Sequence, residues 1–212
     1  TESDIMVDSP TNNFATLNPI MGSTDTHAVT YYEGNLKAYS SGWNGAFATI
    51  PMTSGKWYFE VIGDGTSVYI GAVSLDQDLT DDNPQDWSKA AWYGTGTAGN
   101  FYQAGATSYG DTWVAGDVIG VALDQDANSL TFYKNNASQG AIDLTAKNVG
   151  TDDLVFGFSM DGVTVNVNFG QDSSFGGNKT AQGNQDSNDI GDFYYTPPTG
   201  FLALCTSNLP AV

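Results

Sequence analysis

The chain has 212 residues and a mass of 22.4 kDa, enough for one β-sandwich domain with a sizeable core and some surface segments. It carries 24 acidic residues, six lysines and no arginine, a formal net charge of −18, which disfavours nucleic acid and anionic membrane surfaces as partners. Its apolar runs are much shorter than the roughly 20 residues that a membrane-spanning helix needs, so membrane insertion is not expected.

The composition favours strands over helices. There are 25 Gly, 11 Tyr, 11 Phe and 5 Trp, and only 14% of the residues are charged, which is typical of short strands joined by tight turns. No segment sustains a 3.6-residue apolar period over three turns. Cys205 is the single cysteine, so no disulfide can form within the chain, and its apolar neighbours predict a small buried residue.

The N-terminal region, residues 1–27, is predicted to be an arm with a flexible start that Phe14 and Leu17 attach to the domain. His27 has no acid or nucleophile near it in sequence, which favours an exposed or capping histidine over a catalytic one. Residues 28–40 follow as a strand or a hairpin, with its turn at 33–35, and residues 47–50 read as a short strand ended by a proline.

Two strongly patterned strands come next, at residues 56–62 and 68–73, with a Gly-Asp-Gly turn between them. We expect these strands to pair with each other. The alternation places Trp57, Phe59 and Val61 on the inward face.

Residues 75–92 form a long acidic stretch, expected to be an irregular loop. Short strands are predicted at 91–93 and 99–102. Residues 116–136 then read as a hairpin: apolar residues alternate up to residue 123, a polar turn covers 124–128, and the alternation resumes at Leu130.

Two further alternating segments, 154–160 and 163–169, flank the dipeptide Asp161-Gly162, which is a signal for a two-residue hairpin turn. The expected sandwich spans 28–170. Residues 171–192 are rich in Gly, Asn, Gln and Ser and are interpreted as a surface flap too polar to pack, and residues 193–212 as a C-terminal segment that returns to the sandwich.

The sequence predicts no catalytic residue. It lacks Gly-x-Ser-x-Gly, and the only histidine lies far from the only cysteine. Glycoside cleavage needs a carboxylate pair, and Glu60 has no second acid at the alternating position.

No metal ligand and no cofactor are expected either. Asp124-x-Asp126-x-Asn128 resembles the first half of a calcium loop, but it lacks the later Gly and the distant Glu, so a structural turn is favoured. The glycine-rich run 94–99 has no lysine after it, which argues against a phosphate-binding loop.

The remaining functional candidates are loop residues that could contact another molecule, through aromatic rings above all. Trp43 and Trp87 lie in polar loops and are expected to be exposed, whereas Trp92, Tyr102 and Trp113 are flanked by strand-like sequence and are expected in the core. The predicted partner-binding residues are Trp43, Asn44, Asp86, Trp87, Tyr93 and Tyr109.

Three motifs in order resemble the SPRY family. They are Gly-Lys-Trp-Tyr-Phe-Glu-Val at 55–61, the Gly-Asp-x-Ile-Gly-x-x-Leu-Asp hairpin from residue 116, and Asn-Phe-Gly-Gln-x-x-Phe from residue 168, with one residue more before the final Phe175. The resemblance implies an all-β fold, a bent antiparallel β-sandwich with concanavalin-like jelly-roll architecture. It also implies a non-enzymatic module that binds partners through its loops.

The segments on either side of the motifs resemble stand-alone SPRY proteins of bacteriophages and marine viruses. That likeness implies a virion surface or extracellular protein such as a fibre, tail or capsid decoration component. Its expected partners are other virion proteins and a host surface protein or glycan, and a homo-oligomer is compatible with this role. The alternatives are a purely structural capsid or tail subunit and a secreted lectin-like or glycan-degrading sandwich.

Overall fold

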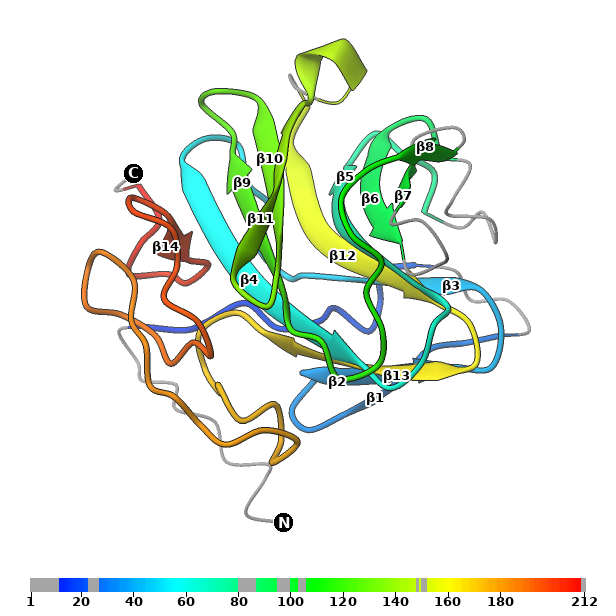
Figure 1. Cartoon of the computed structure of the whole chain (residues 1–212), viewed down its shortest axis with the longest axis horizontal. Helices are drawn as coiled ribbons and strands as arrows, with labels where there is room; N and C mark the ends of the chain where they lie inside the picture. Colours follow the sequence, from blue (N-terminus) through cyan, green and yellow to red (C-terminus); the bar gives the residue numbers. More distant parts are fainter. Residues whose placement is uncertain are drawn as a thin grey trace.

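A computed structural model describes residues 12–22, 27–79, 87–94, 100–102, 106–147, 149 and 152–210. Within these residues the chain forms two sheets that pack face to face, antiparallel except for the parallel pair of β4 and β14 (Figure 1). The first sheet has the order β1-β2-β13-β4-β9-β10-β11, and β14 also pairs with β4. The second has the order β3-β12-β5-β6-β7-β8. The expected all-β sandwich is therefore confirmed.

The strands of the first sheet are β1 (Thr30–Tyr32), β2 (Lys37–Ser40), β4 (Lys56–Gly63), β9 (Ile119–Asp124), β10 (Ser129–Lys134), β11 (Ala137–Asp143), β13 (Val163–Asn168) and β14 (Leu202–Ala203). Those of the second are β3 (Asn44–Phe47), β5 (Val68–Ser74), β6 (Ala90–Gly94), β7 (Asn100–Tyr102), β8 (Ala106–Ser108) and β12 (Leu154–Met160). A 3₁₀ turn, η3 (Thr145–Lys147), follows β11. In the described part of the chain no helix is long and apolar enough to cross a membrane.

The main core lies between the sheets and follows the alternation of the sequence. Trp57, Phe59 and Val61 of β4 all face inward, as predicted, and the Phe59 ring contacts that of Phe156 of β12, with ring centroids 4.3 Å apart and planes tilted by 32°. The β9–β10 hairpin also forms as predicted, and Asp124 pairs with Ser129 across its turn. Two predicted core tryptophans, Trp92 and Trp113, are fully buried, whereas the Tyr102 side chain lies outside the described residues.

Two predicted hairpins are wrong. β4 and β5 lie in opposite sheets, and so do β12 and β13, although short turns join each pair. Hydrogen bonds at these turns connect different strands: the Asp64 carboxylate accepts from Thr164 N at 2.7 Å, and Asp161 N donates to Ser67 O at 3.0 Å. The turns therefore carry the chain from one sheet to the other. In addition, the strand predicted at 47–50 is displaced, because β3 occupies Asn44–Phe47.

The outer face of the first sheet is covered by the segment that follows β13, drawn from orange to red in Figure 1. Phe193, Ala203 and Cys205 pack on Tyr58 and Ala122, and Phe175 packs farther along the same face on Ile62. The expectation that 171–192 is too polar to pack is wrong, because Gln171, Ser173, Phe175 and Asp186 are all buried. The domain boundaries themselves stay predictions.

Hydrogen bonds explain how so polar a segment packs. Asp186 is only 7% exposed, and one of its carboxylate oxygens accepts from Ala203 N and Asn208 Nδ2, each at 2.8 Å. The N-terminal arm attaches as predicted: Leu17 is buried and bridges to Ala48, and Phe14 bridges to Cys205. Cys205 is itself buried, as expected, and burial raises its pKa.

Gly120 has no side chain because the outer face of β9 is already filled. A Cβ at this position would lie 2.4 Å from the Tyr58 hydroxyl oxygen, well inside van der Waals contact. Tyr58 in turn meets Phe193 edge-on at 5.3 Å. The small residues of β9, which alternate with its apolar core residues, therefore make room for Tyr58 beneath the C-terminal segment.

Candidate partner-binding surface

Two of the predicted partner-binding residues, Trp43 and Asn44, lie at the edge of the sandwich where β3 begins. Trp43 is half-buried and stacks on Tyr69 of β5, with ring centroids 4.8 Å apart and planes 15° apart. Asn44 is 2% exposed and donates to His27 O at 3.0 Å. Trp43 therefore presents one side of its indole to solvent, whereas Asn44 holds the chain around it.

Beside Trp43 lies a shallow depression of about 140 Å³. It is formed by the turn at 19–22 of the N-terminal arm, by the residues at the start of β1 and by β3. No charged residue lines it, and its lining residues are Pro19, Ile20, Met21, Gly22, Ala28, Val29, Tyr31 and Gly45. We call this set of residues the arm depression. Trp43 precedes Gly45, one of these lining residues, by two positions.

Ile20 stands at the rim of the arm depression with 93% of its surface exposed, the highest value among the large apolar side chains that are described. A single exposed apolar side chain is common on protein surfaces, so it is the uncharged hollow beside Ile20 that makes this edge a candidate contact surface. Tyr31 adds a hydroxyl group, and burial raises its pKa to about 12, so the group stays neutral near physiological pH.

Trp87 does not belong to this surface, which corrects the expectation that it is exposed. It is 2% exposed and packs on Phe47 and Trp92, with ring centroids 6.0 and 6.1 Å away. Its loop has polar neighbours in sequence, but Trp87 lies just before β6 and fills the core at the far end of β5 from Trp43. The two tryptophans are thus not brought together.

Tyr93 and Tyr109 lie within the body of the domain. Tyr93 is fully buried and its hydroxyl donates to Asp111 O, and burial raises its pKa. Tyr109 is half-buried, donates to Gly140 O at 2.6 Å and meets Tyr93 edge-on at 5.4 Å. Asp86 lies outside the described residues. Binding roles for these residues stay predictions, and Trp43 is the predicted aromatic residue nearest in sequence to a residue that lines the arm depression.

Ile20 and Met21 were missed by the sequence analysis. They lie in a turn directly after Asn18-Pro19, and nothing in their spacing indicates a contact surface. Two adjacent apolar residues in a turn-forming sequence are the one available signal. Only the folded arrangement shows that one is exposed while the other packs on the core.

Glu60, the residue considered for glycoside cleavage, is completely buried on the outer face of β4. Its Oε1 accepts from Tyr195 N at 2.8 Å and from the Tyr58 hydroxyl at 3.2 Å. Its Oε2 accepts from Tyr194 N at 2.8 Å and from Asn168 Nδ2 at 3.3 Å. Burial raises its pKa from 4.5 to about 7, against the lowering effect of these donors. The carboxyl group thus holds the C-terminal segment on the sheet and lies out of reach of a substrate.

The paired aspartates of the β9–β10 turn act as hydrogen-bond acceptors. Asp124 accepts from Ala127 N at 3.0 Å and forms an ion pair with Lys56 at 2.7 Å, and Asp126 accepts from Gly55 N at 2.8 Å. These contacts fix the turn against the start of β4. Within the described residues, no group of three or more His, Cys, Asp or Glu gathers as a metal site.

The described residues thus form an all-β sandwich whose first sheet is covered on its outer face, with an uncharged depression at one edge. The profile of the SPRY domain matches residues 56–172, which is more than half of the chain. The chain therefore belongs to the SPRY domain family, whose members are protein-interaction modules.

Relatives and solved structures agree with this assignment. The Drosophila melanogaster Ran-binding proteins 9/10 homolog is 29% identical over 72% of this chain, and human Ran-binding protein 9 is 28% identical over 77% of it. The chain spans only 16% and 22% of the lengths of these relatives. The SPRY domain of human HERC1 superposes with a TM-score of 0.59 at 18% identity, covering 71% of this chain and 96% of that one.

Proposed function

We propose that this SPRY domain binds a partner protein at the arm depression and that an apolar side chain of the partner occupies it. The observation that carries the proposal is Ile20, 93% exposed at the rim of an uncharged hollow on a chain with a net charge of −18. An apolar centre surrounded by polar surface is the usual anatomy of a protein interface. Trp43, exposed on one side, extends this centre with the type of residue that most often dominates binding energy.

The role at a virion surface that the flanking segments predict is a more specific proposal for the same protein-binding module. It rests on the resemblance stated for those segments in the sequence, and the acidic composition is compatible with it. The relatives reported above are not viral proteins. Adhesion and particle assembly both require protein binding, so the arm depression is the place to test either one. A virion surface location would be tested by immunogold labelling of assembled particles.

Random peptides displayed on phage provide a probe for the binding surface. We expect the wild-type domain to select peptides that share an apolar side chain. Ile20→Asp and Trp43→Ala should each weaken binding of a selected synthetic peptide by about 30-fold, the effect of losing one dominant contact. Isothermal titration calorimetry measures this loss, and thermal melts check that both variants are folded.

Leu75 offers a matched control, because it is also an exposed apolar residue, at 41%, but it follows the far end of β5. Leu75→Asp should bind the selected peptide as tightly as the wild type. Equal weakening by Leu75→Asp, or unchanged binding by Ile20→Asp, would show that the partner docks elsewhere.

A further inference from the structure

A second depression lies on the outer face of the first sheet, at the edge formed by β1. Its volume is about 340 Å³, and its lining residues are Tyr32, Glu33, Lys37, Tyr39 and Thr164. We call this set of residues the tyrosine depression. It shares no lining residue with the arm depression. Tyr32 is 47% exposed and Tyr39 is 37% exposed, so both rings are open to another molecule.

The strand register places these side chains on one face of the sheet. Tyr32 of β1 pairs with Lys37 of β2. Tyr39, the next outward residue of β2, pairs with Thr164 of β13. Ala38, between the two outward residues of β2, is completely buried, as the alternation of a strand requires. Tyr32 and Tyr39 are therefore diagonal neighbours across two strands, a spacing of about 7 to 8 Å.

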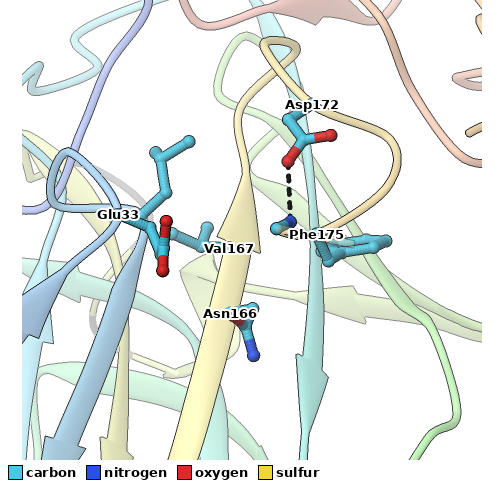
Figure 2. A pocket seen from close by; sticks show the side chains of 7 residues that line it. Glu33, Asn166, Val167, Asp172 and Phe175 are labelled. Atoms are coloured by element: carbon cyan, nitrogen blue, oxygen red, sulfur yellow. Dashed lines mark hydrogen bonds between the residues drawn. The ribbon is translucent and has the colours of Figure 1, made fainter. Parts of the chain in front are cut away.

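The segment that follows β13 covers the neighbouring part of this face. Asn166 of β13 pairs with Ile62 of β4, and Phe175 packs on Ile62. Figure 2 shows Phe175 on one side of β13 and Glu33, which lines the tyrosine depression, on the other. The cover does not extend over the two tyrosines, which stay exposed on β1 and β2.

The polar groups of the tyrosine depression are mainly hydrogen-bond donors. Four of its side chains form no hydrogen bond or ion pair with any described residue: Tyr32, Lys37, Tyr39 and Thr164. Three of these offer a hydroxyl group that can donate, and the Lys37 ammonium group can only donate. The Glu33 carboxylate and the net charge of −18 disfavour an anionic ligand. A ligand that fits is therefore rich in acceptors, poor in donors and able to pack on aromatic rings.

The tyrosine depression differs in this respect from the arm depression. Among the described residues, no Val, Leu, Ile or Met side chain lines it, whereas the arm depression has Ile20, Met21 and Val29. An aliphatic side chain of a partner has its matching surface in the arm depression. The two depressions therefore suit different ligands.

We propose that the tyrosine depression binds a proline-rich segment of a partner protein in the polyproline II conformation. Proline has a carbonyl acceptor and no N–H donor, so such a segment presents acceptors to the donors of the depression. Grooves lined by aromatic side chains are a recurring way to recognise these segments. Polyproline II rises about 3.1 Å per residue, so residues two or three positions apart are about 6 to 9 Å apart, which matches the diagonal spacing of the two tyrosines.

The test titrates an uncharged deca-proline peptide into ¹⁵N-labelled protein. The peptide is added to about 5 mM, several times the dissociation constant of about 0.1 to 1 mM that we expect for so small a contact. The amides of β1, β2 and Thr164 should shift. Tyr39→Ala should weaken binding by about ten-fold or more, because it removes one of the two rings. Tyr39→Phe keeps the ring and loses the hydroxyl donor, so its effect should be smaller.

Ile20→Asp is the control, since it changes the exposed apolar residue of the arm depression and leaves the tyrosines in place. It should bind deca-proline as tightly as the wild type, so this result is independent of the test of the proposed function. Thermal melts of the Tyr39 variants should match the wild type, because the side chain is exposed.

Two results would overturn the proposal. One is that deca-proline leaves the amides of β1 and β2 unshifted, including the case in which a neutral oligosaccharide such as cellohexaose shifts them and the depression binds glycans instead. The other is that Tyr39→Ala binds deca-proline as tightly as the wild type.

Discussion

Replacing Trp87 with alanine should lower the free energy of unfolding by about 3 to 5 kcal/mol. The side chain is 2% exposed and packs between Phe47 and Trp92, so its removal leaves a cavity between the sheets. Urea denaturation followed by tryptophan fluorescence and circular dichroism measures the loss.

Trp87→Phe is the matched variant. The indole N–H of Trp87 has no hydrogen-bond partner among the described residues, so a smaller aromatic ring sacrifices no hydrogen bond. It should therefore cost clearly less than Trp87→Ala. If alanine at this position left stability unchanged, Trp87 would lie at the surface, as its polar sequence neighbours suggest, and the packing described for β6 would be wrong.

Protonation of Glu60 should stabilise the domain in mild acid. Its pKa in the folded chain is raised to about 7, first by burial, whereas the ordinary value is 4.5. A carboxyl group with a raised pKa contributes stability that is present below pH 4.5 and lost as the pH rises through about 7. At 1.36 kcal/mol per unit, the contribution is about 3 kcal/mol.

Glu60→Gln isolates this effect, because glutamine does not titrate. The difference in unfolding free energy between the wild type and the variant should shrink by about 2 to 3 kcal/mol from pH 5 to pH 8. The four groups that contact the carboxyl oxygens are donors that lower its pKa, so Tyr58→Phe, which removes one of them, should raise the pKa of Glu60 further and increase the pH dependence. A difference that grows with pH would mean that the four donors outweigh burial and keep Glu60 ionised.

The alternation of apolar residues predicted the inner faces well. Trp57, Phe59 and Val61 face the core because a period of two assigns every second side chain to one side of a strand. The period does not tell which strand is the neighbour. The turn at Asp161-Gly162 suits a hairpin, yet it can equally carry the chain into the opposite sheet, as it does here.

Sequence patterns could not predict that the outer face of β4 is buried. Tyr58 and Glu60 occupy positions that alternation assigns to solvent, but they are buried by residues about 130 positions later in the chain. The covering segment looked too polar to pack because composition does not show that Asp186 and Asn168 satisfy backbone groups. Trp87 was misjudged for the same reason, since its sequence neighbours are polar while its neighbours in space are aromatic.

The binding surface was predictable only in part. Trp43 was selected as an aromatic residue in a polar loop, and it does lie half-exposed at the edge of the sandwich. Ile20 carries no motif, and its importance rests on exposure that appears only when the arm folds back beside β3.

A map of amide chemical shifts tests the central claim, that this SPRY domain binds its partner at the arm depression, most directly. Titrating a library-selected peptide into ¹⁵N-labelled protein should perturb the amides of Ile20, Met21, Val29, Tyr31 and Gly45, the residues around the hollow. Perturbations confined to the opposite end of the sandwich, around Leu75 and the turn at 124–128, would contradict the claim.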